Sequence, residues 1–162
     1  MAISLAIASL QPVSAQTSTP EVGSGSGLPL PRFVSLKTSE ARARRGPSLT
    51  HRVDWLYTRR DLPLQVTGEF EHWRRVEDSE GQGGWIHETL LSGVRTVVVI
   101  RDMTPMRSSP QPTAHEVALL ENGVIAHIME CAPEWCKLSI GGERGWVNRE
   151  SLWGLFPDEV LD

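Results

Sequence analysis

The chain of 162 residues contains an internal repeat with a spacing of 61 or 62 positions, which constrains its fold more than any other feature. The repeated landmarks are Trp73 with Trp135, Gly84-Trp85-Ile86 with Gly145-Trp146-Val147, and Leu91-Ser92-Gly93 with Leu152-Trp153-Gly154. This period is too long for a solenoid unit and suits a small domain. The sequence therefore predicts two copies of one domain, which we call the first repeat and the second repeat.

Each repeat has the pattern of a β-structure. Leu62, Leu64 and Val66 alternate with other residues, as a half-buried strand requires, and Thr96–Ile100 is a short run of β-formers. Glycine-rich turns follow, and no long window has a helical stripe. We therefore expect an all-β fold of two tandem small β-barrels. A unit of about 60 residues is only marginally stable alone, so the two should pack against each other.

The N-terminus has the pattern of a secretory signal peptide. Ala2 to Leu10 is mostly apolar, and Val13 and Ala15 supply small residues at the positions that signal peptidase requires. This predicts cleavage after Ala15 and a periplasmic or secreted protein. No basic residue precedes Arg32, so a disordered apolar N-terminus is the alternative. The sequence contains no run of 18 apolar residues, so we expect no membrane-spanning segment in the mature chain.

Residues 16–31 are rich in Ser, Thr, Gly and Pro and include the run Gly23-Ser24-Gly25-Ser26-Gly27. Such a composition is typical of a disordered linker, because it offers little apolar surface to bury. The predicted organisation is a signal peptide (1–15), a linker (16–31), the first repeat (32–93), the second repeat (94–157) and a C-terminal tail (158–162).

The repeated motifs resemble those of bacterial SH3-like domains in exported proteins, in particular a proteobacterial tandem subgroup of undefined function. The motifs that carry the likeness are Arg44-Arg45-Gly46-Pro47-Ser48, Leu62-Pro63-Leu64, Trp73-Arg74-Arg75-Val76 and Gly83-Gly84-Trp85-Ile86-His87 in the first repeat, and Gly145-Trp146-Val147 and Leu152-Trp153-Gly154 in the second. The likeness extends from about Phe33 to Pro157. It implies partly open SH3-like barrels and association with the cell envelope or peptidoglycan. Many relatives also carry a hydrolase domain, for which this sequence has no room, so we expect no enzyme.

Cys131 and Cys136 are the two cysteines of the chain. An even number of cysteines in an exported protein predicts a disulfide. A zinc site is the alternative, but it would add only His127 and would lack a fourth ligand. A catalytic thiol would need a histidine partner that the sequence does not indicate. We expect no metal and no cofactor.

A candidate ligand site lies around two aromatic residues of the first repeat. Trp55 and Tyr57 are two positions apart, so an extended chain places both on one face. The candidate residues are Arg52, Trp55, Tyr57, Arg59, Arg60 and, from the second repeat, Trp153. Aromatic rings edged by guanidinium groups can stack on sugars and pair with the carboxylates of stem peptides. Alternatively, Trp55 caps an open barrel end and the arginines are simply solvated.

The charge distribution limits the classes of partner. The chain has a net charge of −4, and Val94–Asp162 carries six basic residues against ten acidic ones. This balance disfavours a nucleic-acid binder. We expect a non-catalytic binding module that recognises peptidoglycan through both glycan and stem peptide. The alternative is a periplasmic adaptor or structural protein that binds an extended peptide of another envelope protein.

Overall fold

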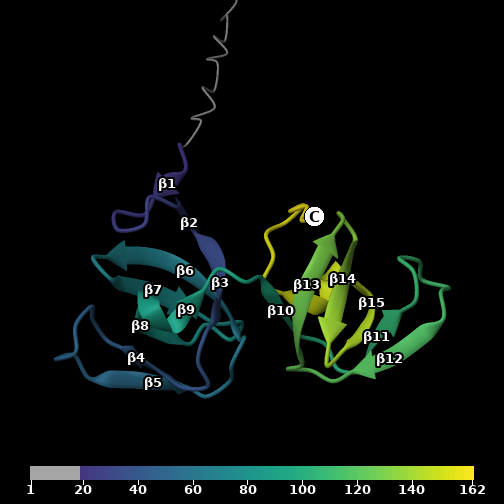
Figure 1. Cartoon of the computed structure of the whole chain (residues 1–162), viewed down its shortest axis with the longest axis horizontal. Coiled ribbons are helices and arrows are strands. Elements are labelled where there is room, and N and C mark those ends of the chain that lie inside the picture. Colours follow the sequence, from purple (N-terminus) through teal and green to yellow (C-terminus); the bar gives the residue numbers. More distant parts are fainter. Residues whose placement is uncertain (1–18) are drawn as a thin grey trace, which may run out of the picture.

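The computed structural model describes residues 19–162, so the predicted signal peptide lies outside the described residues. Each repeat forms one antiparallel sheet of seven strands, and a small hairpin precedes the first (Figure 1). The predicted all-β class and the duplication are confirmed. In residues 19–162, no helix is long and apolar enough to cross a membrane.

The first repeat is an open sheet with the strand order β5-β4-β8-β7-β6-β3-β9. Its elements are β3 (Arg32–Leu36), β4 (Ala41–Arg44), β5 (Val53–Tyr57), β6 (Pro63–Phe70), β7 (Trp73–Glu77), β8 (Gly83–His87), the 3-10 helix η1 (Glu88–Leu90) and β9 (Leu91–Ser92). The outer strands β5 and β9 do not pair with each other, so the sheet does not close into a barrel. Strand β5 is consequently a free edge.

The second repeat has the strand order β12-β11-β15-β14-β13-β10-β16. Its elements are β10 (Thr96–Val99), β11 (Thr104–Arg107), β12 (Glu116–Leu120), β13 (Ile125–Cys131), β14 (Trp135–Ile140), β15 (Glu143–Asn148), the 3-10 helix η2 (Arg149–Ser151) and β16 (Leu152–Trp153). Each strand has a counterpart at the same place in the first sheet. Both sheets also have a bulge in the equivalent long strand, between Val66 and Gly68 in β6 and between Ile128 and Glu130 in β13. The duplication thus extends to the irregularities of the fold.

Each repeat buries its own apolar core. The core of the first repeat is built from Val34, Leu36, Ala41, Ala43, Tyr57, Leu64, Val66, Val76 and Ile86. The core of the second is built from Val97, Val99, Met106, Leu120, Ala126, Cys131, Cys136, Leu138, Val147 and Leu152. Leu64 and Val66 are fully buried while Gln65 between them is not, as the alternating pattern predicts.

The two repeats are in direct contact, as their small size leads one to expect. The ring of Phe33 on β3 packs against the rings of Trp153 and Phe156, with centroid distances of 5.2 and 4.8 Å. In addition, the Thr96 hydroxyl donates a hydrogen bond of 2.7 Å to the carbonyl of Asp61. These contacts fix the position of one sheet relative to the other.

The prediction of a disordered linker over 16–31 is wrong for residues 19–31. Strands β1 (Glu21–Val22) and β2 (Pro29–Leu30) form a hairpin whose loop encloses the carboxylate of Glu69. That carboxylate accepts hydrogen bonds from the backbone N–H groups of Gly25 and Ser26, at 2.9 and 2.8 Å, and from the Ser26 hydroxyl at 2.6 Å. One buried acid therefore orders a segment whose composition offers almost no apolar surface.

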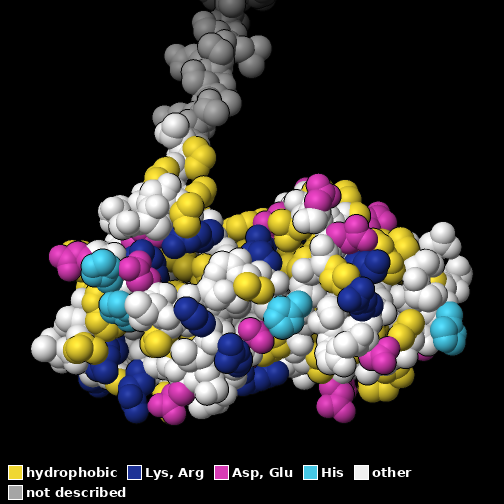
Figure 2. All heavy atoms as spheres, in the orientation of Figure 1, with side chains coloured by type: hydrophobic (Ala, Val, Ile, Leu, Met, Phe, Trp, Pro, Cys, Tyr) yellow, Lys and Arg dark blue, Asp and Glu magenta, His cyan; other side chains and the backbone are white. Residues whose placement is uncertain are grey.

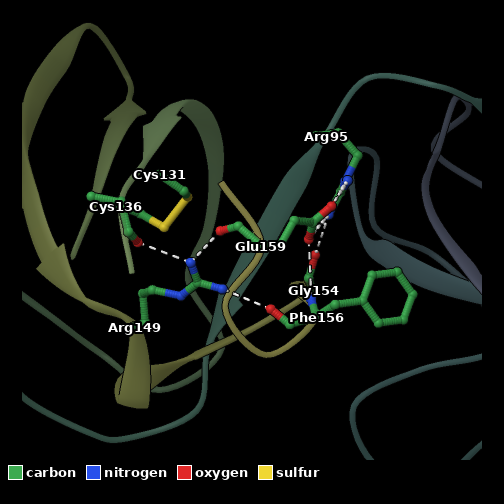
Figure 3. Close-up of a disulfide and its surroundings, with 8 residues drawn as sticks. Arg95, Cys131, Cys136, Arg149, Gly154, Phe156 and Glu159 are labelled. Carbon is green, nitrogen blue, oxygen red and sulfur yellow. Dashed lines mark hydrogen bonds and ion pairs between the residues drawn. A yellow bond between two sulfur atoms is a disulfide. The ribbon is translucent and has the colours of Figure 1, made fainter. Parts of the chain in front are cut away.

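The predicted disulfide between Cys131 and Cys136 is confirmed and joins the facing ends of β13 and β14. The C-terminal segment returns to this hairpin, where Leu161 exchanges two backbone hydrogen bonds with Cys131. Two arginines hold the segment in place (Figure 3). Arg149 donates to the carbonyls of Phe156 and Glu159, and Arg95 binds the Glu159 carboxylate through two bonds of 2.7 and 3.0 Å.

Candidate ligand-binding site

The predicted aromatic pair lies on the free edge strand β5. Trp55 and Tyr57 face the same side of the sheet, opposite Ala43 and Ala41 of β4, and their ring centroids are 6.4 Å apart. The two residues differ in exposure, however: Trp55 is 40% exposed and Tyr57 only 3%. The pair is therefore one accessible indole beside a buried phenol.

Tyr57 belongs to the core of the first repeat. Its hydroxyl donates a hydrogen bond of 2.8 Å to the carbonyl of Gln82, which satisfies its only polar group. Burial, with the nearby Asp78 carboxylate, raises the pKa of Tyr57 well above its usual range. Tyr57 therefore stays neutral, and its ring meets that of Trp55 edge-on.

The predicted arginines fall into two groups. Arg52 pairs with Asp54 at 2.6 Å, and Arg45 pairs with the same carboxylate at 3.2 Å. The hydrogen bond from Arg52 is the largest cause of the lowered pKa of Asp54. Arg59 and Arg60, by contrast, are exposed and form no ion pair with any residue of 19–162. Their guanidinium groups are free for a ligand.

A groove of about 250 Å³ lies between the two repeats beside β5. The first repeat contributes Trp55, Tyr57, Arg59 and Leu62 to its lining, together with the acidic residues Asp78 and Glu80. The second repeat contributes Val98, Val99, Ile100, Asn122 and Gly123. Arg59 reaches across it, because its Nη1 atom lies 3.7 Å from where a Cβ on Gly123 would stand. Pockets that enclose a whole small ligand usually hold about 300–1,000 Å³. This groove suits one ring or one side chain of a larger ligand.

The structure brings together three of the six candidate residues and separates the other three. Trp55, Tyr57 and Arg59 line the groove, whereas Arg52 and Arg60 do not. Trp153 packs edge-on against Phe33 in the contact between repeats, so it holds the repeats together. Asn122 and the Val98–Ile100 backbone were missed, because no sequence signal shows which part of the second repeat faces Trp55.

Basic side chains gather along the lower part of the first repeat, over β4 and β5, while acidic and basic side chains mix on the second (Figure 2). Four arginines, Arg42, Arg44, Arg45 and Arg52, lie on these strands or on the loop that joins them. Within residues 19–162, no group of three or more His, Cys, Asp or Glu side chains could hold a metal ion. The chemistry that this surface offers is stacking and anion pairing.

Comparisons with known proteins bear on the fold and the family. A search of curated protein sequences found no match. Among solved structures, NlpC1 from Trichomonas vaginalis aligns with 15% identity and a TM-score of 0.35 over 81% of this chain, and NlpC2 from the same organism with 14% and 0.35 over 76%. The chain spans about half of each, 48%. The family model described as "Bacterial SH3 domain" matches residues 37–93 and 101–154, one segment in each repeat and more than half of the sequence. The chain therefore belongs to the bacterial SH3 domain family.

Proposed function

We propose that this protein is an exported, non-catalytic binding module of the cell envelope that recognises peptidoglycan through the groove between its repeats. Trp55 stacks on a sugar ring, and Arg59 pairs with a carboxylate of the stem peptide. Membership of the bacterial SH3 domain family supports a binding role. The observation that carries the proposal is the exposed indole of Trp55 in the same groove as the unpaired Arg59.

Residues of both repeats line the groove, so in this proposal ligand binding requires the duplication. The aromatic, basic and acidic groups come from the first repeat, while the second contributes an apolar wall and the amide of Asn122. An amide can donate to and accept from the hydroxyl groups of a sugar. Neither repeat alone would enclose the ligand.

The test is co-sedimentation of the mature chain, Gln16 to Asp162, with purified peptidoglycan sacculi over a series of salt concentrations. We expect binding that weakens as salt screens the Arg59 pair. Trp55→Ala and Arg59→Ala should each weaken it by about 5- to 150-fold, as expected for loss of a stacking or charged contact of about 1–3 kcal/mol.

Matched controls come from the second repeat. Arg144→Ala removes an exposed arginine that does not line the groove, and Leu119→Ala trims an exposed apolar side chain on the equivalent edge strand β12. Both should bind sacculi like the unchanged chain. Equal binding by all four variants would refute the proposed site.

A second candidate function, an adaptor for an extended peptide of another envelope protein, is supported by the free edges of the sheets. Leu56 on β5 and Leu119 on β12 are counterparts, and both are largely exposed, at 46% and 48%. An edge strand with exposed apolar side chains can accept an added strand. A pull-down from an envelope extract that recovers one protein, with no binding to sacculi at low salt, would favour this function.

Export is a separate part of the proposal. The predicted cleavage after Ala15 places the mature N-terminus at Gln16, and the disulfide fits an oxidising compartment. Expression of the whole chain in a bacterial host, followed by cell fractionation and mass spectrometry, should yield a periplasmic or secreted protein that begins at Gln16. An unprocessed chain retained in the cytoplasm would contradict the prediction.

A further inference from the structure

A second hollow, of about 470 Å³, lies on the first repeat where β4, β7 and β8 meet. It shares no lining residue with the groove between the repeats. Its charged lining consists of three arginines and two carboxylates, namely Arg44, Arg45, Arg75, Asp54 and Glu77, and Trp85 provides an aromatic wall. The balance of charge in this hollow is positive.

Two glycines hold the three strands close enough to form the hollow. A Cβ on Gly83 would lie 1.9 Å from the carbonyl oxygen of Val76 on β7, and one on Gly84, with φ 153°, would lie 2.6 Å from that of Arg44 on β4. Only glycine allows β8 to approach both neighbours so closely. In this arrangement Trp85 stands opposite Arg75 on one side and opposite Arg44 on the other.

The three guanidinium groups are unequally occupied. Arg44 donates to the carbonyls of Leu49 and His51, at 3.2 and 2.9 Å, and so braces the loop between β4 and β5. Arg45 shares the carboxylate of Asp54 with Arg52. Arg75 is exposed and forms no ion pair with any other described residue, although Glu77 lines the same hollow. One strong donor group in the hollow is therefore unused.

The counterpart positions in the second repeat have different partners. Lys137 is the counterpart of Arg75 and stands opposite Trp146, with its Nζ atom 5.9 Å from the centroid of that ring. Arg107, the counterpart of Arg44, pairs with Glu116 at 3.5 Å and donates to the carbonyl of Ala114. At these positions Arg107 is paired with a carboxylate and Lys137 lies over an aromatic ring, whereas Arg75 has neither kind of partner among residues 19–162.

We propose that this hollow binds an oxyanion, a carboxylate or a phosphate, through Arg75 and Arg45 beside the ring of Trp85. A guanidinium fork matches the two oxygens of a carboxylate or phosphate. The partly apolar wall formed by Trp85 strengthens such a pair by excluding water from one side. Asp54 competes with the ligand for Arg45, and salt screens the attraction between the anion and both arginines. This inference does not depend on the proposed recognition of peptidoglycan.

The experiment is an NMR titration of the ¹⁵N-labelled mature chain, with succinate and inorganic phosphate added separately at constant ionic strength. The indole N–H signals of Trp85 and Trp146, assigned with Trp85→Phe and Trp146→Phe, report on the hollow and on its counterpart. We expect a saturable shift of the Trp85 signal alone. Arg75→Gln should weaken binding about tenfold, as expected for loss of a charged hydrogen bond, while the matched Lys137→Gln should leave it unchanged.

The two anions identify the chemistry of the ligand. Saturation with succinate only would assign a carboxylate, saturation with phosphate only would assign a phosphate, and saturation with both would leave the site a general oxyanion site. Equal, non-saturating shifts of both tryptophans, or a titration unaffected by Arg75→Gln in a variant with an otherwise unchanged spectrum, would overturn the inference. Because no sacculi are used, these outcomes are distinct from those that test the groove.

Discussion

The two repeats hold the same hairpin together by different means. In the first, Glu69 and Arg74 face each other across β6 and β7, and their side chains form an ion pair of 3.5 Å. In the second, the equivalent pair across β13 and β14 is Cys131 and Cys136, which form the disulfide. The ion pair of the first repeat thus occupies the position that the disulfide occupies in the second.

Each of these hairpins also receives one end of the described chain. The loop between β1 and β2 wraps the carboxylate of Glu69, and Leu161 forms two backbone hydrogen bonds with Cys131. The end of an exposed hairpin is a natural docking point, because its last backbone groups have no partner in the sheet. We therefore expect the two hairpins to differ in sensitivity: the contacts around Glu69 should respond to pH, and the hairpin closed by the disulfide should respond to reductant.

The repeats also differ in how many of their basic side chains have partners within the protein. In the second repeat Arg95, Arg107, Lys137 and Arg149 all engage groups of the protein itself. In the first, Arg59, Arg60 and Arg75 form no ion pair with any residue of 19–162, whereas in the second only Arg144 among the arginines of the described chain is exposed with neither an ion pair nor a side-chain hydrogen bond. This contrast places both proposed ligand sites on basic groups of the first repeat, with the second repeat acting as a wall and a brace.

The largest effect on stability should come from Glu69→Ala. Glu69 has a side-chain exposure of 0%, and its removal leaves Gly25, Ser26 and Arg32 without this acceptor. Arg74 would keep Glu88 as its one ion-pair partner in residues 19–162. Breaking a buried ion pair by removing one partner costs about 3 kcal/mol or more. Chemical denaturation should show this loss. The control is Glu71→Ala, which removes an exposed neighbouring carboxylate and should change stability little; equal effects of both variants would contradict the role of Glu69.

Acid should weaken the first junction by titrating the same residue. Burial opposes ionisation of Glu69, but hydrogen bonds from Ser26 and Arg32 outweigh it and lower the pKa from 4.5 to about 2. Because the pKa is lower in the folded state, the ionised Glu69 carboxylate stabilises the protein fully above pH 4.5. This contribution is lost as the pH falls from 4.5 to about 2. The difference in free energy of unfolding between the unchanged chain and Glu69→Gln should shrink over this range. A constant difference would show that Glu69 does not titrate there.

Reduction of the disulfide should have a smaller effect. Closing the short loop from Cys131 to Cys136 contributes about 2 kcal/mol in the chain-entropy model. We expect denaturation in the presence of a reductant to show a loss of this size, and the Cys131→Ala/Cys136→Ala variant to be insensitive to reductant. If reductant also destabilised the double variant, the effect would not come from the disulfide.

The sequence predicted the parts of this fold that the two repeats share. Trp73 and Trp135, or Gly84 and Gly145, recur because each copy needs the same strand pairings, so a single comparison of the chain with itself reveals them. The disulfide was predictable for a similar reason, since only two cysteines exist and they flank one short hairpin connection.

The parts that could not be predicted depend on contacts between distant segments. The loop of residues 23–27 is ordered by Glu69, which lies more than 40 positions away, with 43 between Ser26 and Glu69. Trp55 and Tyr57 both lie opposite alanines, and Tyr57 differs because its ring joins the core and its hydroxyl reaches the carbonyl of Gln82, 25 positions further along the chain. The groove depends on how Phe33 and Phe156 pack the repeats together. Composition and periodicity contain none of this information.

The smallest effect on stability, and the sharpest test of the contrast in surface charge, should come from Asp54→Asn. The Asp54 carboxylate lies at the surface, where its pairs with Arg45 and Arg52 stabilise the fold little, so the denaturation midpoint should not change measurably. The same substitution releases Arg45 from its only ion pair in residues 19–162. Phosphate or succinate should then bind the hollow beside Trp85 several times more tightly, as read from the saturation of the Trp85 indole signal.

Glu150→Gln, at an exposed ion pair in the second repeat, should alter neither the denaturation midpoint nor the affinity for the anion. Unchanged affinity in Asp54→Asn would mean that Arg45 takes no part in the site and that Arg75 binds the anion alone.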